Sequence, residues 1–240
     1  MKNQMFIVSS NERLARDVYR MQLVGDTQGI GRPGQFVNIA LEGHFLRRPI
    51  SVCDYDERSF TIIYKVVGEG TRRMSELVRG ARLDVLLGLG NGFDTDCCPQ
   101  DCTLVGGGVG VPPMYALAKA LVKKGKSVTV ILGFNAKEDV FYEQQFRDLG
   151  CRVLVTTMDG SYGSRGFATD VMQEGAYAFA CGPRAMLRAV FDKSGDGQFS
   201  FEERMGCGFG ACMGCTCKTK EGPKRVCKEG PVFFKEAVAW

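Results

Sequence analysis

Histidine is almost absent from this 240-residue sequence, and so are long apolar runs: it has one histidine and one tryptophan. The histidine, His44, lies in the segment EGHFLRRP, where we expect a loop residue and not a general base. No apolar run approaches the roughly 18 residues of a membrane span. The N-terminal MKNQMFIVSS lacks the apolar centre of a secretory signal. We therefore expect a cytoplasmic protein with no membrane partner.

The sequence also lacks any long run of charge of one sign. Its 31 Lys and Arg residues are scattered among 27 Asp and Glu residues, which gives a net charge of +4. A nucleic-acid interface gathers basic residues into a stripe or patch, so we expect no nucleic-acid partner. The hydrophobic content of 45% and the charged content of 24% are ordinary for a soluble globular protein.

Residues 1–99 have the pattern of an all-β domain. Only the segment 71–80 has a helical pattern there. Gly, Pro and Asp clusters separate short apolar or β-branched runs, and this spacing is typical of an antiparallel barrel. The expected strands are MFIVSS (5–10), VYRMQLVG (18–25), QFVNIAL (35–41), SFTIIYKVV (59–67) and RLDVLLGLG (82–90).

Residues 100–199 alternate between strand and helix patterns, which predicts a doubly wound parallel sheet with crossover helices. The expected strands are 102–107, 127–134, 151–157 and 176–182, and the expected helices are 112–125, 137–150, 167–175 and 183–191. The remaining residues, 200–240, are rich in Gly and Cys and are expected to form a small subdomain. The domain boundaries are therefore placed near residues 99 and 200.

Cysteine is abundant: the chain has eleven, and four of them follow the spacing C-x4-C-x2-C-x11-C. In a reducing compartment such a number indicates metal or redox chemistry and not disulfides. The first three positions have the plant-type 2Fe–2S spacing, which a more distant fourth cysteine completes. The backbone must wrap the inorganic sulfides, so small residues that tolerate positive φ are needed between the thiolates. The expected cluster ligands are Cys207, Cys212, Cys215 and Cys227.

Zinc is the alternative for this cysteine set, but zinc ribbons usually carry two short cysteine pairs. Cys217 follows Cys215 by two residues, and in an extended segment its side chain would leave the loop, so we expect it not to be a ligand. The cysteines 97, 98 and 102 form a looser group without glycines, which we interpret as part of an interdomain loop.

The segment DKSGDGQFSFEE (192–203) fits the spacing of an EF-hand calcium loop. An EF-hand also requires an exiting helix, and RMGCGFGAC cannot form one. A helix stop followed by a turn explains the same residues, so calcium remains the less favoured alternative.

Two Gly-rich or Arg-containing motifs in the first domain indicate a pyrophosphate ligand. In RRPIS, Arg48 supplies a cation, Pro49 fixes the turn and Ser51 adds a hydroxyl. GEGT (68–71) is a Gly-rich turn that opens the helix of this domain, and its N–H groups suit a second phosphate.

The α/β domain opens with another Gly-rich turn, LVGGGVGVPP (104–113), where Gly107, Gly108 and Gly110 are expected to bind a nicotinamide dinucleotide. A plain βα turn is the alternative. No acidic residue clearly follows the next strand to bind a ribose 2′-hydroxyl, so NAD and NADP both remain open. Cys181 and Gly182 end a later strand, at the carboxyl edge of the sheet where ligands bind. A buried core cysteine is the alternative for Cys181.

These motifs, in this order, resemble the ferredoxin reductase-type flavoproteins. Within them the sequence is most similar to the electron-transfer subunits of bacterial class 1B dihydroorotate dehydrogenases. The resemblance extends over nearly the whole chain and is most specific from EERM to GPVF. The motifs that carry it are LRRPIS, YKVVGEGTRRMSELVRG, LGNGF, VGGGVGVPPMYALAK, ACGPRAML, FSFEERMGCGFGACMGCTCKTK and KRVCKEGPVF.

The resemblance implies an oxidoreductase subunit with FAD, a 2Fe–2S cluster and NAD, in which the substrate chemistry belongs to another subunit. It implies that the same four cysteines hold the cluster. The residues it implies for FAD are Arg48, Pro49, Ile50, Ser51, Ile63, Tyr64, Lys65, Gly70 and Thr71.

The resemblance also implies a partner, an FMN-containing catalytic subunit that oxidises dihydroorotate in pyrimidine biosynthesis, in a heterotetramer of two subunits of each kind. A related subunit of an NAD(P)H:ferredoxin, sulfide or hydrogenase oxidoreductase is the alternative. In the bifurcating ferredoxin reductase a carboxylate is expected among the cluster ligands, whereas all four positions here are cysteines. The alternative of another class is a non-catalytic module that binds zinc and calcium.

Overall fold

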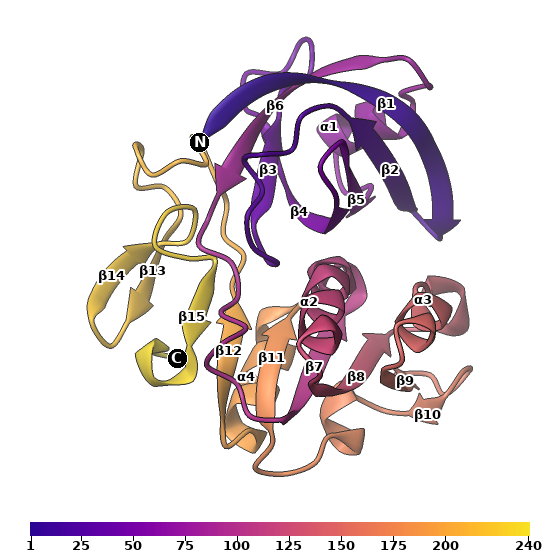
Figure 1. The fold of residues 1–240 in the computed structure, drawn as a ribbon, viewed down its shortest axis with the longest axis vertical. Coiled ribbons are helices and arrows are strands. Elements are labelled where there is room, and N and C mark those ends of the chain that lie inside the picture. The colour runs from indigo at the N-terminus through magenta and orange to yellow at the C-terminus, as the bar shows by residue number, and fades with distance from the viewer.

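The computed structural model describes residues 1–240, and its N-terminal part is a closed antiparallel barrel (Figure 1). The strands follow the order β1-β2-β5-β4-β3-β6 around the barrel. Their bounds are β1 (Lys2–Ala15), β2 (Val18–Val24), β3 (Phe36–Ile39), β4 (Arg48–Tyr55), β5 (Ser59–Lys65) and β6 (Arg82–Leu89), and the helix α1 (Glu69–Ser75) precedes β6.

Alternation of side chains decides which face of each barrel strand is inside. In β3, Val37 and Ile39 belong to the barrel core, while Phe36 packs in a separate cluster against the C-terminal part of the chain. The two faces are thus assigned by the period of two of an extended strand. Because both faces of β3 are buried, the strand is apolar almost throughout.

The second unit is a seven-stranded sheet with the order β10-β9-β8-β7-β11-β12-β15, parallel except for the antiparallel β15 at its edge. The expected β-barrel and doubly wound α/β architecture is therefore confirmed. The strands are β7 (Asp101–Gly107), β8 (Ser127–Phe134), β9 (Arg152–Thr157), β10 (Ser164–Arg165), β11 (Tyr177–Cys181), β12 (Asp196–Ser200) and β15 (Val232–Phe234).

Helices cover both faces of this sheet. Helix α2 (Val111–Lys123) packs between the sheet and strand β4 of the barrel, α3 (Glu143–Asp148) lies beside β9, and α4 (Arg184–Lys193) covers the opposite face (Figure 1). Helix α2 and the barrel are also joined by an ion pair between Lys119 and Asp54, whose Nζ and Oδ1 atoms are 2.9 Å apart. No helix has both the length and the apolar character needed to cross a membrane.

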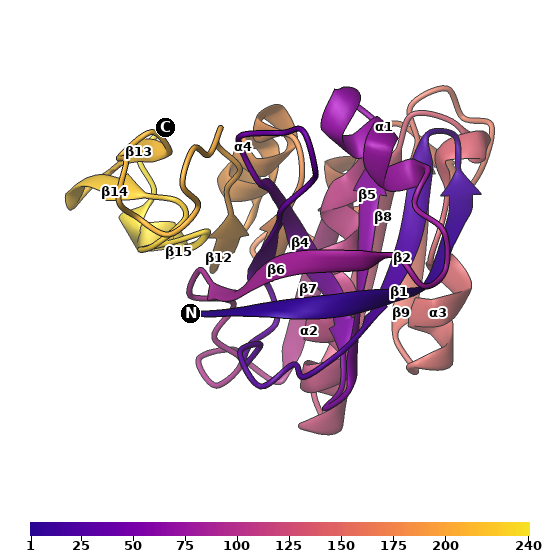
Figure 2. The same cartoon turned by 90° about the horizontal axis from the view of Figure 1, so that it is seen from above.

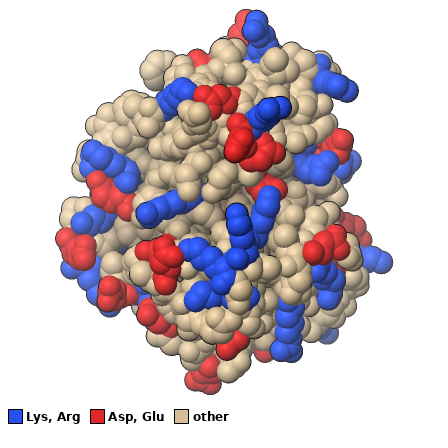
Figure 3. All heavy atoms as spheres, in the orientation of Figure 1, with Lys and Arg blue, Asp and Glu red and all other residues tan.

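The C-terminal segment contains the hairpin β13 (Thr216–Thr219) and β14 (Gly222–Arg225) and then returns to the large sheet as β15. Figure 2 shows the hairpin at one end of the molecule, beyond β12 and β15. Acidic and basic side chains are interspersed over the face drawn in Figure 3.

The structure corrects three of the expected elements. The expected helix 137–150 is only α3, because Tyr142 adopts a positive φ of 67° and interrupts it. The segment 167–175 contains only a short 3-10 turn at 168–171. The segment 192–203 contains the end of α4 and the strand β12, so the calcium alternative lacks a helix–loop–helix.

Candidate cofactor and metal sites

A cavity of about 590 Å³ lies at the carboxyl ends of β7 and β11. The chain builds the sheet outward from β7 through β8 and β9 and then returns to add β11 on the other side. Such a switch point leaves a crevice where parallel sheets bind dinucleotides. The expected residues Gly107, Gly108, Gly110 and Gly182 all line the cavity.

Gly110 allows a very close approach of two backbone segments at this crevice. A Cβ atom added to Gly110 would lie 2.2 Å from the carbonyl oxygen of Cys181. Cys181 itself is buried in the core next to α2, and burial raises the pKa of its thiol to about 12. The side chain is therefore a protonated core thiol, and its expected contact with the dinucleotide stays a prediction.

Several residues that no sequence motif assigned to the dinucleotide also line the cavity. Lys65 comes from β5 of the barrel, Thr156 lies in β9 and Met158 directly follows it, and Phe167 precedes the 3-10 turn at 168–171. They come from three separate segments, and only the packing of the barrel on the sheet brings them together. Glu202, which follows β12, closes the cavity on another side.

Arg48 and the Gly-rich turn before α1 meet, as the two motifs predict. A Cβ atom added to Gly70 would lie 1.9 Å from Nε of Arg48, so the guanidinium group passes directly over this glycine. The hydroxyl of Thr71 accepts the backbone N–H groups of Val67 and Gly68 at 2.9 and 3.2 Å, and this holds the turn in shape. A cation over a Gly-rich turn suits a phosphate group.

The expected flavin residues do not all present their side chains to one face. Ile50 packs against the barrel core, whereas its neighbours Pro49 and Ser51 lie on the opposite, outward face of β4 by alternation. The side chain of Tyr64 lies in the barrel core, where its hydroxyl donates to Asn11 at 2.9 Å. Ile63 packs in the core next to the α/β sheet. Through their side chains, Tyr64 and Ile50 thus support the barrel, and any role in binding FAD stays a prediction.

The cysteine loop directs backbone N–H groups at its own sulfur atoms. The N–H groups of Ala211 and Cys212 lie 3.2 and 3.4 Å from Sγ of Cys207, and that of Cys207 lies 3.4 Å from Sγ of Cys212. Further along, the N–H of Cys227 points at Sγ of Cys215 at 3.4 Å. Such donors stabilise thiolates, which are the form that binds iron.

The pKa values of two of these thiols differ strongly. Burial would raise the pKa of Cys207, but backbone N–H groups, led by that of Cys212, lower it to about 6. Burial, followed by the neighbouring Cys215, raises the pKa of Cys227 to about 12. Cys207 is thus mostly a thiolate at neutral pH, whereas Cys227 requires the charge of a bound metal to ionise. N–H donors aimed at the sulfur atoms of Cys207, Cys212 and Cys215 suit thiolates, and a set of four cysteines is the ligand chemistry of a 2Fe–2S cluster.

Two side chains hold this loop from different sides. Nδ2 of Asn38, in β3 of the barrel, donates to the carbonyl oxygen of Cys207 at 3.1 Å. Nη1 of Arg225, in β14, donates to the carbonyl oxygen of Gly210 at 2.6 Å. The sequence analysis assigned neither residue a role, although Arg225 lies in KRVCKEGPVF and Asn38 is a polar residue inside the apolar strand QFVNIAL.

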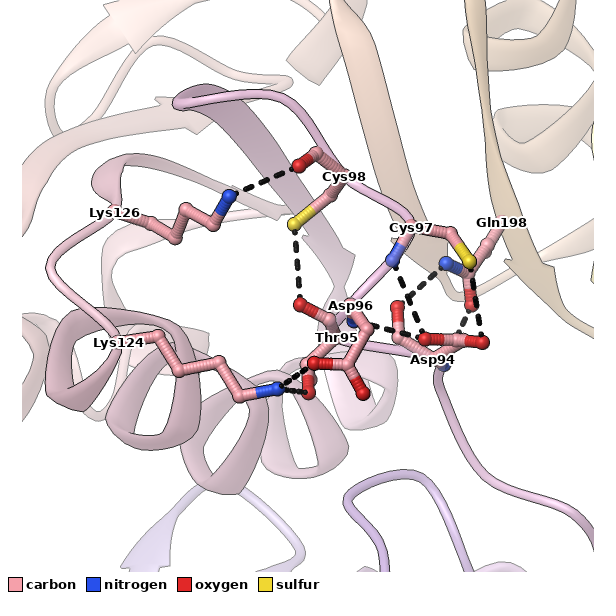
Figure 4. Close-up of polar contacts among 8 residues, drawn as sticks. All are labelled: Asp94, Thr95, Asp96, Cys97, Cys98, Lys124, Lys126 and Gln198. Carbon is pink, nitrogen blue, oxygen red and sulfur yellow. Dashed lines mark hydrogen bonds and ion pairs between the residues drawn. The ribbon is translucent and has the colours of Figure 1, made fainter.

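Three other cysteines belong to segments outside this loop, whereas Cys217 packs against the hydrophobic cluster that contains Cys215 and Cys227. Cys217 is in β13, and the same hydrophobic cluster includes Phe36 and Leu89. Cys97 and Cys98 lie in the segment between β6 and β7, where their thiols contact Asp94 Oδ2 at 3.4 Å and the Thr95 carbonyl at 3.5 Å (Figure 4). Each thiol of this pair therefore has its own partner. Cys102 is a buried residue of β7.

Comparison with known proteins supports the cofactor types expected here. Residues 202–239 match the model of the iron–sulfur cluster binding domain of dihydroorotate dehydrogenase B, and residues 104–192 match an oxidoreductase NAD-binding domain. An electron transfer subunit of dihydroorotate dehydrogenase B (NAD(+)) from Fusobacterium nucleatum subsp. nucleatum is 44% identical over 99% of both chains. The corresponding subunit from Geobacillus sp. (strain WCH70) is 44% identical over 97% of both chains.

The chain belongs to this family of electron transfer subunits. The resemblance drawn from the motifs is thereby confirmed. A chain in the structure of an NADH-dependent reduced ferredoxin-NADP oxidoreductase, described in work on flavin-based electron bifurcation, superimposes with a TM-score of 0.87 and 30% identity. The superposition covers 98% of this chain and 90% of the oxidoreductase chain. Phthalate dioxygenase reductase shares the fold, with a TM-score of 0.67 and 23% identity over 80% of this chain and 64% of its own.

Proposed function

We propose that this chain conducts electrons from a dihydroorotate-oxidising catalytic subunit to NAD+. An FMN-containing partner oxidises the substrate, and this subunit passes the electrons on through a 2Fe–2S cluster and FAD. The observation that carries the proposal is the 44% identity to dihydroorotate dehydrogenase B electron transfer subunits over essentially the full length. In this proposal the assembly is a cytoplasmic heterotetramer with two subunits of each kind, and it serves pyrimidine biosynthesis.

The three cofactor sites of the proposal follow one another around the barrel. The dinucleotide cavity reaches Lys65 at the end of β5. The neighbouring strand β4 presents Pro49 and Ser51 outward, and the next strand, β3, carries Asn38 against the cysteine loop. Adjacent strands are about 4.8 Å apart, so this order brings the three sites within a short distance of one another.

The residues of this chain bind and position the cofactors and do not transform the substrate. Arg48 and the 68–71 turn hold the FAD pyrophosphate, the outward face of β4 receives the flavin, and the four cysteines hold the cluster. A bound flavin exchanges a hydride with nicotinamide and exchanges single electrons with a cluster. Gly107, Gly108 and Gly110 position the dinucleotide at the switch point.

Anaerobic purification of the chain together with its partner tests the proposal. Iron, acid-labile sulfide and flavin are measured per chain, and NADH is then added while the flavin absorbance is followed. The expected result is two irons, two sulfides and one FAD per chain, with bleaching of the flavin by NADH. An FMN-bearing subunit that oxidises dihydroorotate should co-purify. Zinc in place of iron, or no reduction by NADH, would contradict the proposal.

One alternative is favoured by a specific observation. The likeness to the ferredoxin-NADP oxidoreductase chain, at 30% identity, supports a subunit that serves a different partner in a related complex. Both functions use the same cofactors, so the partner distinguishes them. Co-purification of a ferredoxin-reducing subunit, with no oxidation of dihydroorotate, would establish the alternative.

A further inference from the structure

Asn38 is a buried polar residue on the outward face of a barrel strand. Its neighbours Val37 and Ile39 point into the barrel core, so alternation places Asn38 on the side of the C-terminal segment. Only 1% of the residue is exposed. Burial of an amide costs free energy of folding unless its polar atoms form hydrogen bonds.

The amide nitrogen of Asn38 is paired with the cysteine loop. Nδ2 donates to the carbonyl oxygen of Cys207 at 3.1 Å. Gly208, the next residue of the loop, also lies close to this amide, since a Cβ atom added to Gly208 would lie 2.4 Å from Nδ2. Gly208 also has a φ of +77°, so this position needs glycine on two grounds. The loop and the amide are therefore fitted to each other.

The backbone of Asn38 is paired with β4, the strand that the proposed function assigns to the flavin. Asn38 pairs directly with Pro49 in the antiparallel ladder between β3 and β4. Pro49 is on the outward face that the proposed function assigns to the flavin. Arg47 also donates to the carbonyl oxygen of Asn38, at 3.3 Å, and bonds Oδ1 of Asp84 at 2.9 Å. The backbone of Asn38 is thus held by hydrogen bonds within the barrel.

The amide oxygen of Asn38 is buried and accepts no hydrogen bond from the protein. A buried amide that uses only its nitrogen is unfavourable compared with an apolar residue of the same shape. The hydrogen bond that the Asn38 side chain does form is the one that Nδ2 donates to Cys207, which is an expected cluster ligand.

We propose that Asn38 is a positioning residue that fixes the Cys207 end of the cluster loop against the flavin-binding strand. It thereby sets the separation across which single electrons pass between the two cofactors. This inference rests on the proposed function, because it takes the cluster and the flavin as the occupants of the two sites. Asn38 touches neither cofactor in this role and acts through Cys207.

The test compares the variants N38A and N38D with the wild type, each carrying its cofactors, by three measurements. Stopped-flow absorbance separates bleaching of the flavin by NADH from the subsequent reduction of the cluster. A potentiometric titration gives the midpoint potential of the cluster, and electron paramagnetic resonance (EPR) of the reduced cluster reports its geometry. The matched control is N91A. Asn91 also ties the barrel to the C-terminal segment, through bonds to the Glu229 and Val232 carbonyls at 3.1 and 2.7 Å, but not to the cysteine loop.

In N38A we expect hydride transfer to the flavin at the wild-type rate, together with reduction of the cluster slowed about tenfold and an altered EPR signal, because small misplacements of redox partners are costly. In N38D we expect a lower midpoint potential, since a carboxylate disfavours the more negative, reduced cluster. N91A should match the wild type in all three measurements.

Wild-type behaviour of both Asn38 variants would overturn the inference and leave the proposed function intact. The same changes in N91A would also overturn it, by showing that general docking of the segment is responsible. A wild-type chain that binds no cluster would overturn the proposed function itself. N38D is nearly isosteric, so it keeps the test available if N38A does not fold.

Discussion

Arg225 holds the backbone of the cysteine loop at Gly210, where Nη1 of the arginine donates to the carbonyl oxygen at 2.6 Å. Glu229 orients that arginine, since its carboxylate accepts the backbone N–H of Arg225 at 2.7 Å and Nε at 3.0 Å. The bond to Arg225 lowers the pKa of Glu229 to about 2, so the carboxylate stays ionised at neutral pH. The loop is thus fixed by the hairpin as well as by the barrel.

Replacement of Arg225 by Gln should weaken retention of the cluster. The shorter, neutral side chain loses both the contact with Gly210 and the pairing with Glu229, so the loop between Cys207 and Cys212 becomes free to move. We expect severalfold faster loss of iron to a chelator, followed by the fall in visible absorbance. The control is K224Q, because neighbouring Lys224 pairs only with exposed Glu221, at 3.4 Å. Equal rates of loss in both variants would contradict this role of Arg225.

Replacement of Gly70 by Ala should weaken binding of FAD with little effect on folding. The added Cβ would lie 1.9 Å from Nε of Arg48, and because this side chain is flexible it can move away. The move costs little stability but takes the cation away from the Gly-rich turn. We expect a dissociation constant for FAD about tenfold higher, which corresponds to about 1.4 kcal/mol, and a nearly unchanged melting temperature. Fluorescence titration with FAD measures the former.

The control for this change is G31A, outside this turn. A Cβ atom added to Gly31 would meet nothing within 4 Å. The affinity of G31A for FAD should equal that of the wild type. A G70A variant that binds FAD normally would show that Arg48 has no part in the site.

The sequence predicted those parts of the sites that are local in the chain. The cysteine spacing, the Gly-rich turns and the Arg48 motif each lie within a few residues, and the strand and helix periods gave the two architectures. The contact of Arg48 with Gly70 followed from two such motifs. Tyr64 shows the limit of this approach, because a resemblance places its strand near the flavin but does not say which way each side chain points.

What could not be predicted depends on contacts between distant segments. Asn38 and Cys207 are 169 residues apart, and only the packing of the C-terminal segment on the barrel brings them together. Similarly, the sequence did not predict β12, because its residues also fit a turn. The five residues of β12 form a strand by pairing with β11, and no local pattern shows that partner. Tertiary context decides such short strands.

Replacement of Gly110 by Ala should damage both stability and dinucleotide binding. Here the added Cβ would meet backbone, 2.2 Å from the carbonyl oxygen of Cys181, so one of the two segments must shift. We expect a loss of about 1–3 kcal/mol in the free energy of unfolding, as for other overpacked sites, and a higher KM for NADH. Urea unfolding and the rate of flavin bleaching measure these. G31A, where nothing lies within 4 Å, should change neither quantity, and an unaltered G110A would refute the close approach.

Replacement of Asp94 by Asn should make Cys97 more reactive. Oδ2 of Asp94 lies 3.4 Å from the exposed Cys97 thiol, and this contact is the main reason that the pKa of Cys97 is raised (Figure 4). Asparagine keeps the Oδ1 acceptor for the backbone N–H groups of Asp96 and Cys97 but removes the negative charge. The pKa should fall, so more thiolate is present at pH 8 and alkylation becomes faster.

Peptide mass spectrometry after a timed reaction with iodoacetamide measures this rate at Cys97 alone, with the buried Cys98 as a slow internal reference. The control variant is D96N, which removes the adjacent carboxylate. Asp96 pairs with Lys124 at 2.5 Å and makes a smaller contribution to the shift at Cys97. D94N should therefore react faster than D96N, and D96N only slightly faster than the wild type. If D94N reacted more slowly than the wild type, the carboxylate would not be what holds the Cys97 proton in place.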